Sequence, residues 1–173
     1  MNFKHEYMAD TIKELLKCSK SDCVVFFNKP LNCDEVGIYI SALANQAVLC
    51  SSPYAYALWG FNPETQEAIG TDYSFNQETI VPFLSTNAVF TSQSIEYDGK
   101  NVVILEVQRA ADTTIQYRGD EYILYKGRPV RLSSFQNMFW RTERSDIVFE
   151  HTYLSLVSEI FYAVHYDDTV EYA

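Results

Sequence analysis

The sequence predicts an α+β fold, in which a mixed, largely antiparallel β-sheet is packed with helices. Three observations lead to this fold class. Apolar residues repeat at helical spacing in several separate segments of the chain. Short β-branched and aromatic runs lie between these segments. Two of the runs flank Asp98-Gly99-Lys100, and an Asp-Gly pair between strands is a strong signal for a tight hairpin.

The length and composition of the chain fit one globular domain. With 173 residues, 47% hydrophobic and 15% aromatic, the chain can bury its own core. No apolar run approaches the roughly 20 residues that span a bilayer. The N-terminal segment, with Lys4 and Glu6, does not have the layout of a signal peptide. We therefore expect a soluble, cytoplasmic protein without a membrane segment, whose main domain covers residues 1–144.

The first elements alternate between helix and strand. Residues 7–17 carry an apolar face at helical spacing and predict the first helix. Val24–Phe27 is β-branched and aromatic, which predicts a strand ending before Pro30. Asn32, followed three residues later by Glu35, has the pattern of a capping box, so the second helix should begin there.

The second helix and the next strand form the central unit of the predicted fold. Small residues that permit close packing flank the apolar face of this helix: Gly37, Ser41, Ala42 and Ala44. Residues 51–53 should end it. The continuous apolar run over residues 54–61 predicts a central strand covered on both faces. The turn at residues 62–65 should then lead into a short returning strand at residues 67–70.

The second half of the chain predicts two hairpins. Residues 77–84 are a helix candidate interrupted by Pro82. Strands are expected at residues 88–97, 102–107, 115–117 and 122–125, and the turn between the last two contains Arg118 and Gly119. We expect these strands to extend the central sheet.

Two further helices are predicted near the C-terminus. Ser133 or Ser134 can cap a short helix that runs to Arg141. Residues 152–165 have the periodicity of an amphipathic helix, and an acidic tail follows it. This helix and the acidic tail make up residues 145–173. We expect them to pack on the domain formed by residues 1–144.

Charge limits the classes of partner. The net charge is −10, and the excess of basic residues is confined to residues 101–144. A nucleic-acid-binding surface usually needs a basic face, which only this segment can supply. The candidate binding residues are Lys126, Arg128, Arg131, Arg141 and Arg144. The first three alternate roughly as one face of a strand or loop, with Tyr122 and Tyr125 as candidate stacking platforms. A solvated, positively charged edge strand is the competing interpretation.

Motifs for nucleotide or metal chemistry are missing from the sequence. It contains no phosphate-binding glycine loop and no zinc-protease or nucleophile-elbow motif. Four cysteines, Cys18, Cys23, Cys33 and Cys50, are spaced too widely for a zinc pair, so reduced thiols are expected. The adjacent acids Asp34/Glu35, Asp120/Glu121 and Asp167/Asp168 are typical of solvated caps and turns. We therefore predict no metal and no cofactor.

Several segments resemble one protein family. These are residues 34–45 (DEVGIYISALAN), residues 57–70 (ALWGFNPETQEAIG), residues 102–110 (VVILEVQRA), Tyr122-Ile123 and Phe139-Trp140-Arg141. In order and spacing, over about residues 18–141, they resemble the Schlafen/AlbA-like DNA-binding domain, found in bacterial regulator-like proteins and in animal Schlafen proteins. The resemblance implies an α+β domain that binds nucleic acid.

The resemblance also implies where a nuclease site would lie. In Schlafen ribonucleases three acids form a metal-dependent site, and at the matching positions this chain has Lys20, Val25 and Asn62. Phe27 replaces a lysine of the family pattern. The Tyr-Ile-Arg-Ile-Gly-Ser element of many relatives reads Tyr122-Ile123-Leu124-Tyr125-Lys126-Gly127 here, so an arginine is also missing, although Lys126 and Arg128 supply charge nearby. Because a cation, an apolar group and a neutral amide cannot replace three carboxylates, we expect no catalytic residues and no nuclease activity.

Two functions are favoured at this level. The first is a catalytically inert Schlafen/AlbA-like module that binds DNA or RNA, with a regulatory role. The alternative is a protein–protein interaction module, a homodimer or partner-binding protein that uses Tyr153, Leu156 and Ile160 and has lost nucleic-acid binding. The acidity of the chain favours the alternative, because it repels phosphate. A third and less favoured interpretation is an enzyme with other chemistry.

Overall fold

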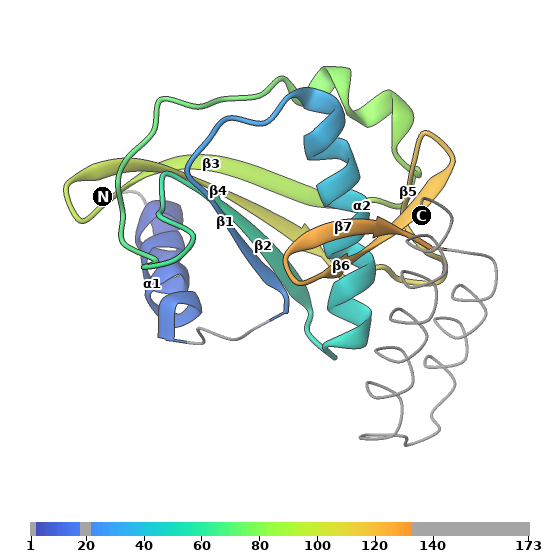
Figure 1. Ribbon diagram of the computed structural model, residues 1–173, viewed down its shortest axis with the longest axis horizontal. Coiled ribbons are helices and arrows are strands. Elements are labelled where there is room, and N and C mark those ends of the chain that lie inside the picture. Colours follow the sequence, from blue (N-terminus) through green and yellow to red (C-terminus); the bar gives the residue numbers. More distant parts are fainter. Residues whose placement is uncertain (1–2, 18–21, 133–173) are drawn as a thin grey trace, which may run out of the picture. The chain divides into compact units, whose positions relative to one another are not determined.

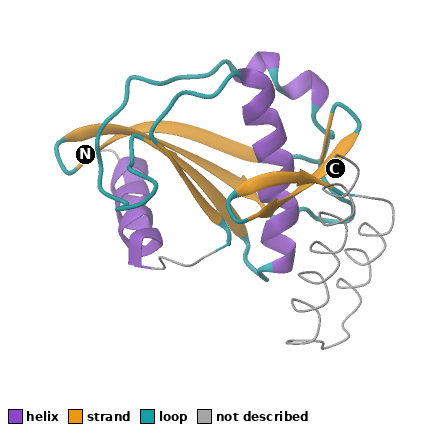
Figure 2. Cartoon of the chain, viewed as in Figure 1, coloured by secondary structure: helices purple, strands orange, loops and turns teal. Residues whose placement is uncertain are grey.

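The computed structural model describes residues 3–17 and 22–132 (Figure 1). The first part of this chain contains α1 (Phe3–Lys17), β1 (Val24–Phe27), α2 (Cys33–Leu49) and β2 (Tyr54–Trp59). Two 3-10 helices follow, η1 (Gln77–Thr79) and η2 (Val81–Phe83). The remaining strands are β3 (Phe90–Tyr97), β4 (Lys100–Gln108), β5 (Gln116–Tyr117), β6 (Asp120–Tyr125) and β7 (Arg128–Arg131). The predicted α+β class is confirmed (Figure 2).

The larger sheet has four strands in the order β1-β2-β4-β3. β1 pairs with β2 in parallel, whereas β2 with β4 and β3 with β4 are antiparallel. β2 is therefore an interior strand, as its continuous apolar sequence predicts. The β3–β4 hairpin turns at Asp98 and Gly99, whose φ angles of 50° and 69° are those of the tight turn expected for Asp-Gly.

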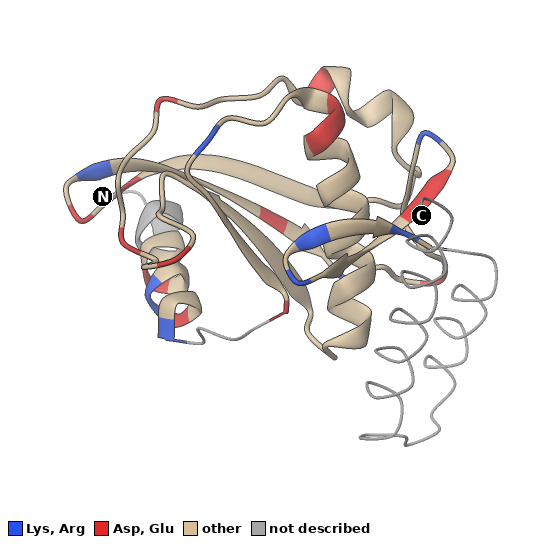
Figure 3. Ribbon diagram, in the orientation of Figure 1, with Lys and Arg blue, Asp and Glu red and all other residues tan. Residues whose placement is uncertain are grey.

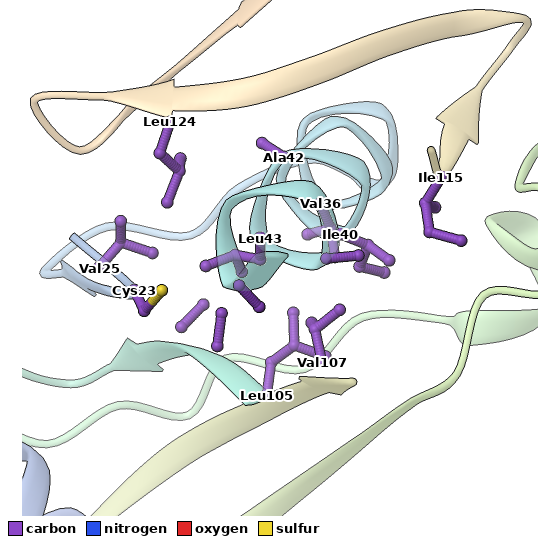
Figure 4. Close-up of a cluster of buried hydrophobic side chains, with 14 of the residues drawn as sticks. Cys23, Val25, Val36, Ile40, Ala42, Leu43, Leu105, Val107, Ile115 and Leu124 are labelled. Atoms are coloured by element: carbon purple, nitrogen blue, oxygen red, sulfur yellow. The ribbon is translucent and has the colours of Figure 1, made fainter. Parts of the chain in front are cut away.

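Helix α2 packs between the two sheets. Its capping box is present as predicted: the Asn32 side chain accepts from the Glu35 N–H at 2.9 Å, and the Glu35 carboxylate accepts from the Asn32 N–H at 2.8 Å. Figure 4 shows Leu124 and Ile115 on one side of the helix and Leu105 and Val107 on the other. All these side chains belong to one buried cluster, so α2 is covered on both sides.

The strands after residue 115 form a separate sheet, so the expectation that both hairpins extend the central sheet is wrong. β5, β6 and β7 form their own antiparallel sheet in the order β5-β6-β7, and Tyr117 of β5 also makes an isolated bridge to Leu84. This small sheet lies against α2 because Ser41 and Asn45, both fully buried on the helix, bond the main chain of Ile115 and Tyr122. Strand periodicity does not reveal such side-chain bonds.

Helix α1 covers part of the other face of the four-stranded sheet. Met8 and Ile12 pack there with Leu58, Phe61 and other apolar residues of the sheet. The helix begins at Phe3, four residues before the predicted start, because its first turn contributes little to the apolar pattern. Among the described residues, no helix is long and apolar enough to cross a membrane.

Two local predictions need correction, and others fall outside the described residues. The segment 67–70 makes a single bridge, Phe61 to Ala68, because left-handed conformations at Gly60, Gln66 and Gly70 interrupt a strand. Residues 77–84 form η1 and η2 rather than one helix, with Pro82 inside η2. The predicted helices over 133–141 and 152–165, the acidic tail and the domain division after residue 144 lie outside the described residues.

Candidate nucleic-acid interface

The described part of the predicted interface is the β6–β7 hairpin. Tyr125 pairs with Arg128, and the two-residue turn between them is Lys126-Gly127. The φ angles of Lys126 and Gly127 are 50° and 74°, which gives the hairpin a tight turn. Lys126 and Arg128 are exposed, and Figure 3 shows basic residues at this end of the hairpin. We call Tyr125, Lys126, Gly127 and Arg128 the hairpin tip.

The hairpin tip is held against the rest of the domain. The Tyr39 hydroxyl of α2 donates a hydrogen bond to the Gly127 carbonyl at 3.2 Å. A Cβ on Gly127 would lie 4.0 Å from Val25 Cγ1, so the turn passes close above β1. Burial raises the pKa of Tyr39, although the charge of Arg128 opposes this effect. Tyr39 therefore remains a neutral hydroxyl donor near neutral pH.

Arg131 lies at the other end of β7, away from the hairpin tip. Arg128 and Arg131 are three residues apart in a strand and therefore point to opposite faces, so the predicted common face is wrong for Arg131. The Arg131 guanidinium also forms an ion pair with the Asp120 carboxylate. This pairing lowers its capacity to neutralise a phosphate.

The two tyrosines expected as stacking platforms differ in their surroundings. The Tyr122 N–H donates to Ser41 Oγ at 3.2 Å, and its carbonyl accepts from Asn45 Nδ2 at 2.8 Å. Tyr122 thus helps to dock β6 on α2. The Lys126 ammonium lies 5.3 Å from the centre of the Tyr125 ring, a cation–π arrangement at the hairpin tip. Arg141 and Arg144 lie outside the described residues.

The positions that match the family's nuclease acids have structural roles where they are described. Val25 is 5% exposed and belongs to the core around α2. Asn62 Oδ1 accepts hydrogen bonds from the N–H groups of Glu64 and Thr65 at 2.9 and 3.3 Å, which fixes the turn after β2. Phe27 stacks on Trp59 with ring centres 5.0 Å apart. Lys20 lies outside the described residues.

Within residues 3–17 and 22–132, no three His, Cys, Asp or Glu side chains are grouped to hold a metal ion. The cysteines of this part of the chain are free thiols. A hydrogen bond between the Cys23 and Cys50 thiols raises the pKa of Cys23 and lowers that of Cys50. The sequence spacing of these cysteines does not predict this contact, which forms because the end of α2 returns to the start of β1.

Asp34 and Glu121, each from one of the predicted pairs of adjacent acids, accept hydrogen bonds from other parts of the domain. Asp34 accepts from the Tyr117 hydroxyl at 2.5 Å and from Arg118 Nη2 at 2.8 Å, across more than 80 residues of sequence. Glu121 accepts from the Thr114 hydroxyl at 2.5 Å and from Gln116 Nε2 at 3.0 Å. These contacts stabilise the second sheet. Asp167 and Asp168 lie outside the described residues.

Glu106 is a charged residue of the larger sheet that the sequence patterns above do not single out. It lies in the interior strand β4, where the neighbouring residues Leu105 and Val107 are buried. Glu106 is the single acid in the apolar run of β4, and this pattern is the sequence signal for a partly buried carboxylate.

Comparison with known proteins supports the fold and does not extend to function. No protein-family model matches the chain, and no curated protein matches it. A solved structure, the DIP2311 protein from Corynebacterium diphtheriae, is similar with a TM-score of 0.52 and 14% sequence identity. The similarity covers 82% of this chain and 29% of that protein. The chain therefore has the fold of one part of a larger protein, and at this identity the likeness concerns the fold alone.

Proposed function

We propose that this chain is a catalytically inert Schlafen/AlbA-like module that binds nucleic acid through the hairpin tip, with a regulatory role in the cytoplasm. The observation that carries the proposal is the exposure of Lys126 within a tight turn and of Arg128 directly after it, next to the ring of Tyr125. Cations with an adjacent aromatic ring are the combination that single-stranded nucleic acids bind, through phosphate contacts and base stacking.

The assignment to the Schlafen/AlbA-like family rests on the sequence segments, and the chain order of the elements agrees with it. The segment DEVGIYISALAN lies within α2, the next segment contains the end of β2 and its turn, and VVILEVQ lies within β4. The absence of nuclease activity is proposed because Val25 is buried and Asn62 is used by its own turn. Neither position offers a carboxylate to a metal ion.

Binding to labelled oligonucleotides tests the proposal. Single-stranded DNA, single-stranded RNA and duplex DNA are titrated at about 50 and 150 mM salt, because phosphate contacts weaken as salt rises. Replacing both Lys126 and Arg128 by alanine should weaken binding by about tenfold or more, if each charged contact contributes about 1 kcal/mol. Tyr125→Ala should weaken binding to single strands more than to duplex DNA.

A matched control separates the hairpin tip from the overall charge. Lys13→Ala with Lys17→Ala removes the same charge from α1, where both lysines pair with acids of the helix. This control should change affinity by less than about threefold, because its charges are distant and screened. Equal weakening by the two double variants, or no salt-sensitive binding to any probe, would contradict the proposal.

The second candidate is the protein–protein interaction module. Two of the basic residues of the second half, Arg118 and Arg131, are engaged in ion pairs with Asp34 and Asp120, so less positive charge is available for phosphate. Homodimerisation through Tyr153, Leu156 and Ile160 is tested by light scattering of a variant with Leu156→Asp and Ile160→Asp. A dimer that becomes a folded monomer supports this function, whereas a monomeric wild type contradicts homodimerisation.

A further inference from the structure

Two cysteines that are distant in the sequence meet at one end of α2. Cys50 is the C-cap of this helix, and Cys23 directly precedes β1. The Cys23 carbonyl accepts from the Tyr56 N–H at 2.8 Å, which aligns the start of β1 with β2. Because β2 begins at Tyr54, shortly after Cys50, the chain returns to Cys23 as soon as the helix has ended. Both cysteines are free thiols, and they are hydrogen-bonded to each other.

The two thiols differ in their exposure to solvent. Cys50 is exposed. Cys23 is 3% exposed and belongs to the buried cluster around α2, in which Figure 4 labels it. A small dissolved oxidant therefore meets Cys50 first, and Cys23 is reached through its contact with Cys50.

The hydrogen bond prepares Cys50 to react. Donation by the Cys23 thiol lowers the pKa of Cys50, and a second bond from Gln46 Nε2 at 3.8 Å acts in the same direction, whereas desolvation and the charge of Asp22 oppose them. The thiolate is the form that attacks an oxidant. The bond to Cys50, followed by burial, raises the pKa of Cys23, so Cys23 keeps its proton while Cys50 is a thiolate.

We propose that Cys50 is an oxidation site for hydroperoxides, and that Cys23 converts the oxidised sulfur into a reversible Cys23–Cys50 disulfide. The exposed thiol meets the oxidant, and the buried thiol is already in contact with the sulfur that it attacks. The pair is separate from the hairpin tip and does not depend on the function proposed above.

The reaction begins at the Cys50 thiolate. It attacks the outer oxygen of a hydroperoxide, the O–O bond breaks, and the alkoxide or hydroxide that leaves takes a proton from water. Cys50 is then a sulfenic acid and has lost the negative charge that bonded the Cys23 proton. The Cys23 sulfur attacks the Cys50 sulfur, the S–O bond breaks, and the leaving hydroxide takes the Cys23 proton to form water. One hydroperoxide has thus accepted two electrons from two thiols.

Thiols reverse the reaction and restore both cysteines. A glutathione thiolate attacks one sulfur of the bridge and releases the other cysteine, and a second glutathione frees the first as glutathione disulfide leaves. While it persists, the bridge closes a loop that contains β1 and α2. Such a loop restricts the unfolded chain, so the oxidised protein should melt at a higher temperature than the reduced protein.

Peptide mapping of the whole wild-type chain tests the proposal. The reduced protein is treated with a small excess of hydrogen peroxide, the remaining thiols are blocked, and the digest is analysed by mass spectrometry without reductant. A peptide pair linked through Cys23 and Cys50 should be the main product, and dithiothreitol should remove it. Bridges to Cys18 or Cys33, bridges between two chains, or oxidation of Cys50 to a sulfinic acid without a bridge would overturn the proposal.

The variants Cys23→Ala and Cys33→Ala form a matched pair. Without Cys23, the sulfenic acid of Cys50 cannot be resolved, so dimedone, which reacts with sulfenic acids, should label Cys50. Cys33→Ala should form the bridge as wild type does and should show little labelling. Circular dichroism checks that both variants are folded. Equal dimedone labelling of Cys50 in the two variants would overturn the role of Cys23.

Oxidation of the unfolded chain tests the part played by the fold. In urea at a concentration that unfolds the protein, the contact between the two thiols is lost, so peroxide should give a mixture of bridges among the four cysteines. The folded protein should give the Cys23–Cys50 bridge selectively. The same selectivity in both states would show that the folded geometry does not direct the reaction, and would overturn the proposal.

Discussion

The side-chain amide of Asn45 bonds both main-chain groups of Ile115. Its Nδ2 donates to the Ile115 carbonyl at 3.0 Å, and its Oδ1 accepts from the Ile115 N–H at 2.8 Å. The same Nδ2 also donates to the Tyr122 carbonyl at 2.8 Å. Asn45 is fully buried, so these bonds lie in a place that water does not reach. One helix residue thus supplies the partners that a neighbouring strand would otherwise provide.

We expect Asn45→Ala to destabilise the domain strongly. The Ile115 N–H and the Tyr122 carbonyl would lose the hydrogen bonds that Asn45 makes to them, whereas the Ile115 carbonyl would still accept from Ser41 Oγ at 2.7 Å. An unsatisfied buried group costs about 1–3 kcal/mol, so the free energy of unfolding should fall by about 2–5 kcal/mol. Urea unfolding followed by circular dichroism measures this loss.

Asn87→Ala is the control for the asparagine substitution. Asn87 is exposed, and its Nδ2 donates to Thr113 Oγ1 at 3.3 Å on the surface. Its loss should change the free energy of unfolding by less than about 0.5 kcal/mol. Equal effects of the two substitutions would show that the bonds to Ile115 contribute little.

Local patterns predicted the first part of the fold well. The capping box at Asn32 and Glu35 depends on residues three positions apart, and the tight turn at Asp98-Gly99 depends on adjacent ones. Both are formed as expected, because the groups that bond or bend are neighbours in the chain. The central position of β2 was also predicted, since a strand covered on both faces has no polar alternation.

The placement of the second sheet could not be predicted in the same way. The hairpins that turn at Asp98-Gly99 and at Arg118-Gly119 have similar signatures, but only the first joins the larger sheet. What separates them is the contact of Asn45 with Ile115, about 70 residues away along the chain. The ion pair of Arg131 with Asp120 depends on how β7 folds back on β6. The sequence does not show this pairing, so the number of basic residues available to a nucleic acid was overestimated.

We expect Gly37→Ala to destabilise the protein, although alanine is the better helix former by about 1 kcal/mol. A Cβ at residue 37 would lie 2.2 Å from Cε2 of the Tyr117 ring, which is buried at the helix surface. Overpacking of this kind costs about 1–3 kcal/mol, and the helix preference offsets only part of it. Thermal unfolding of the variant measures the balance.

The double variant Gly37→Ala with Tyr117→Leu checks the cause. Removing the ring gives the new methyl group space, so the two substitutions should cost less together than the sum of their separate effects. Strict additivity would mean that the loss in Gly37→Ala does not come from the Tyr117 ring.

Stability should depend on pH through Asp34. The hydrogen bond from Tyr117, followed by that from Arg118, holds the pKa of Asp34 below its ordinary value of 3.8. The folded state therefore favours the carboxylate more than the unfolded chain does, and this stabilisation is complete above about pH 5. It is lost as the pH falls through 3.8 toward the lower pKa of the folded state.

Comparison of wild type with Asp34→Asn measures this contribution. The difference in free energy of unfolding between the two proteins should be largest near neutral pH and should shrink between about pH 5 and pH 3. Asp72→Asn, which changes an exposed acid in the loop before η1, serves as the control. A constant difference for Asp34→Asn across this range would contradict the assignment.

Cys50 should be more reactive than Cys23. The hydrogen bond from the Cys23 thiol, with a second from Gln46 Nε2 at 3.8 Å, lowers the pKa of Cys50, whereas the bond to Cys50 and burial raise that of Cys23. Because the thiolate is the reacting form, iodoacetamide at neutral pH should modify Cys50 much faster than Cys23.

The variant Cys23→Ala tests the cause of this difference. It removes the donor and should therefore raise the pKa of Cys50, which slows the alkylation of Cys50 at neutral pH and shifts the pH midpoint of its rate upward. Peptide mapping by mass spectrometry resolves each site, with Cys33→Ala as the control. An unchanged midpoint in Cys23→Ala would mean that the bond between the two thiols does not set the reactivity of Cys50.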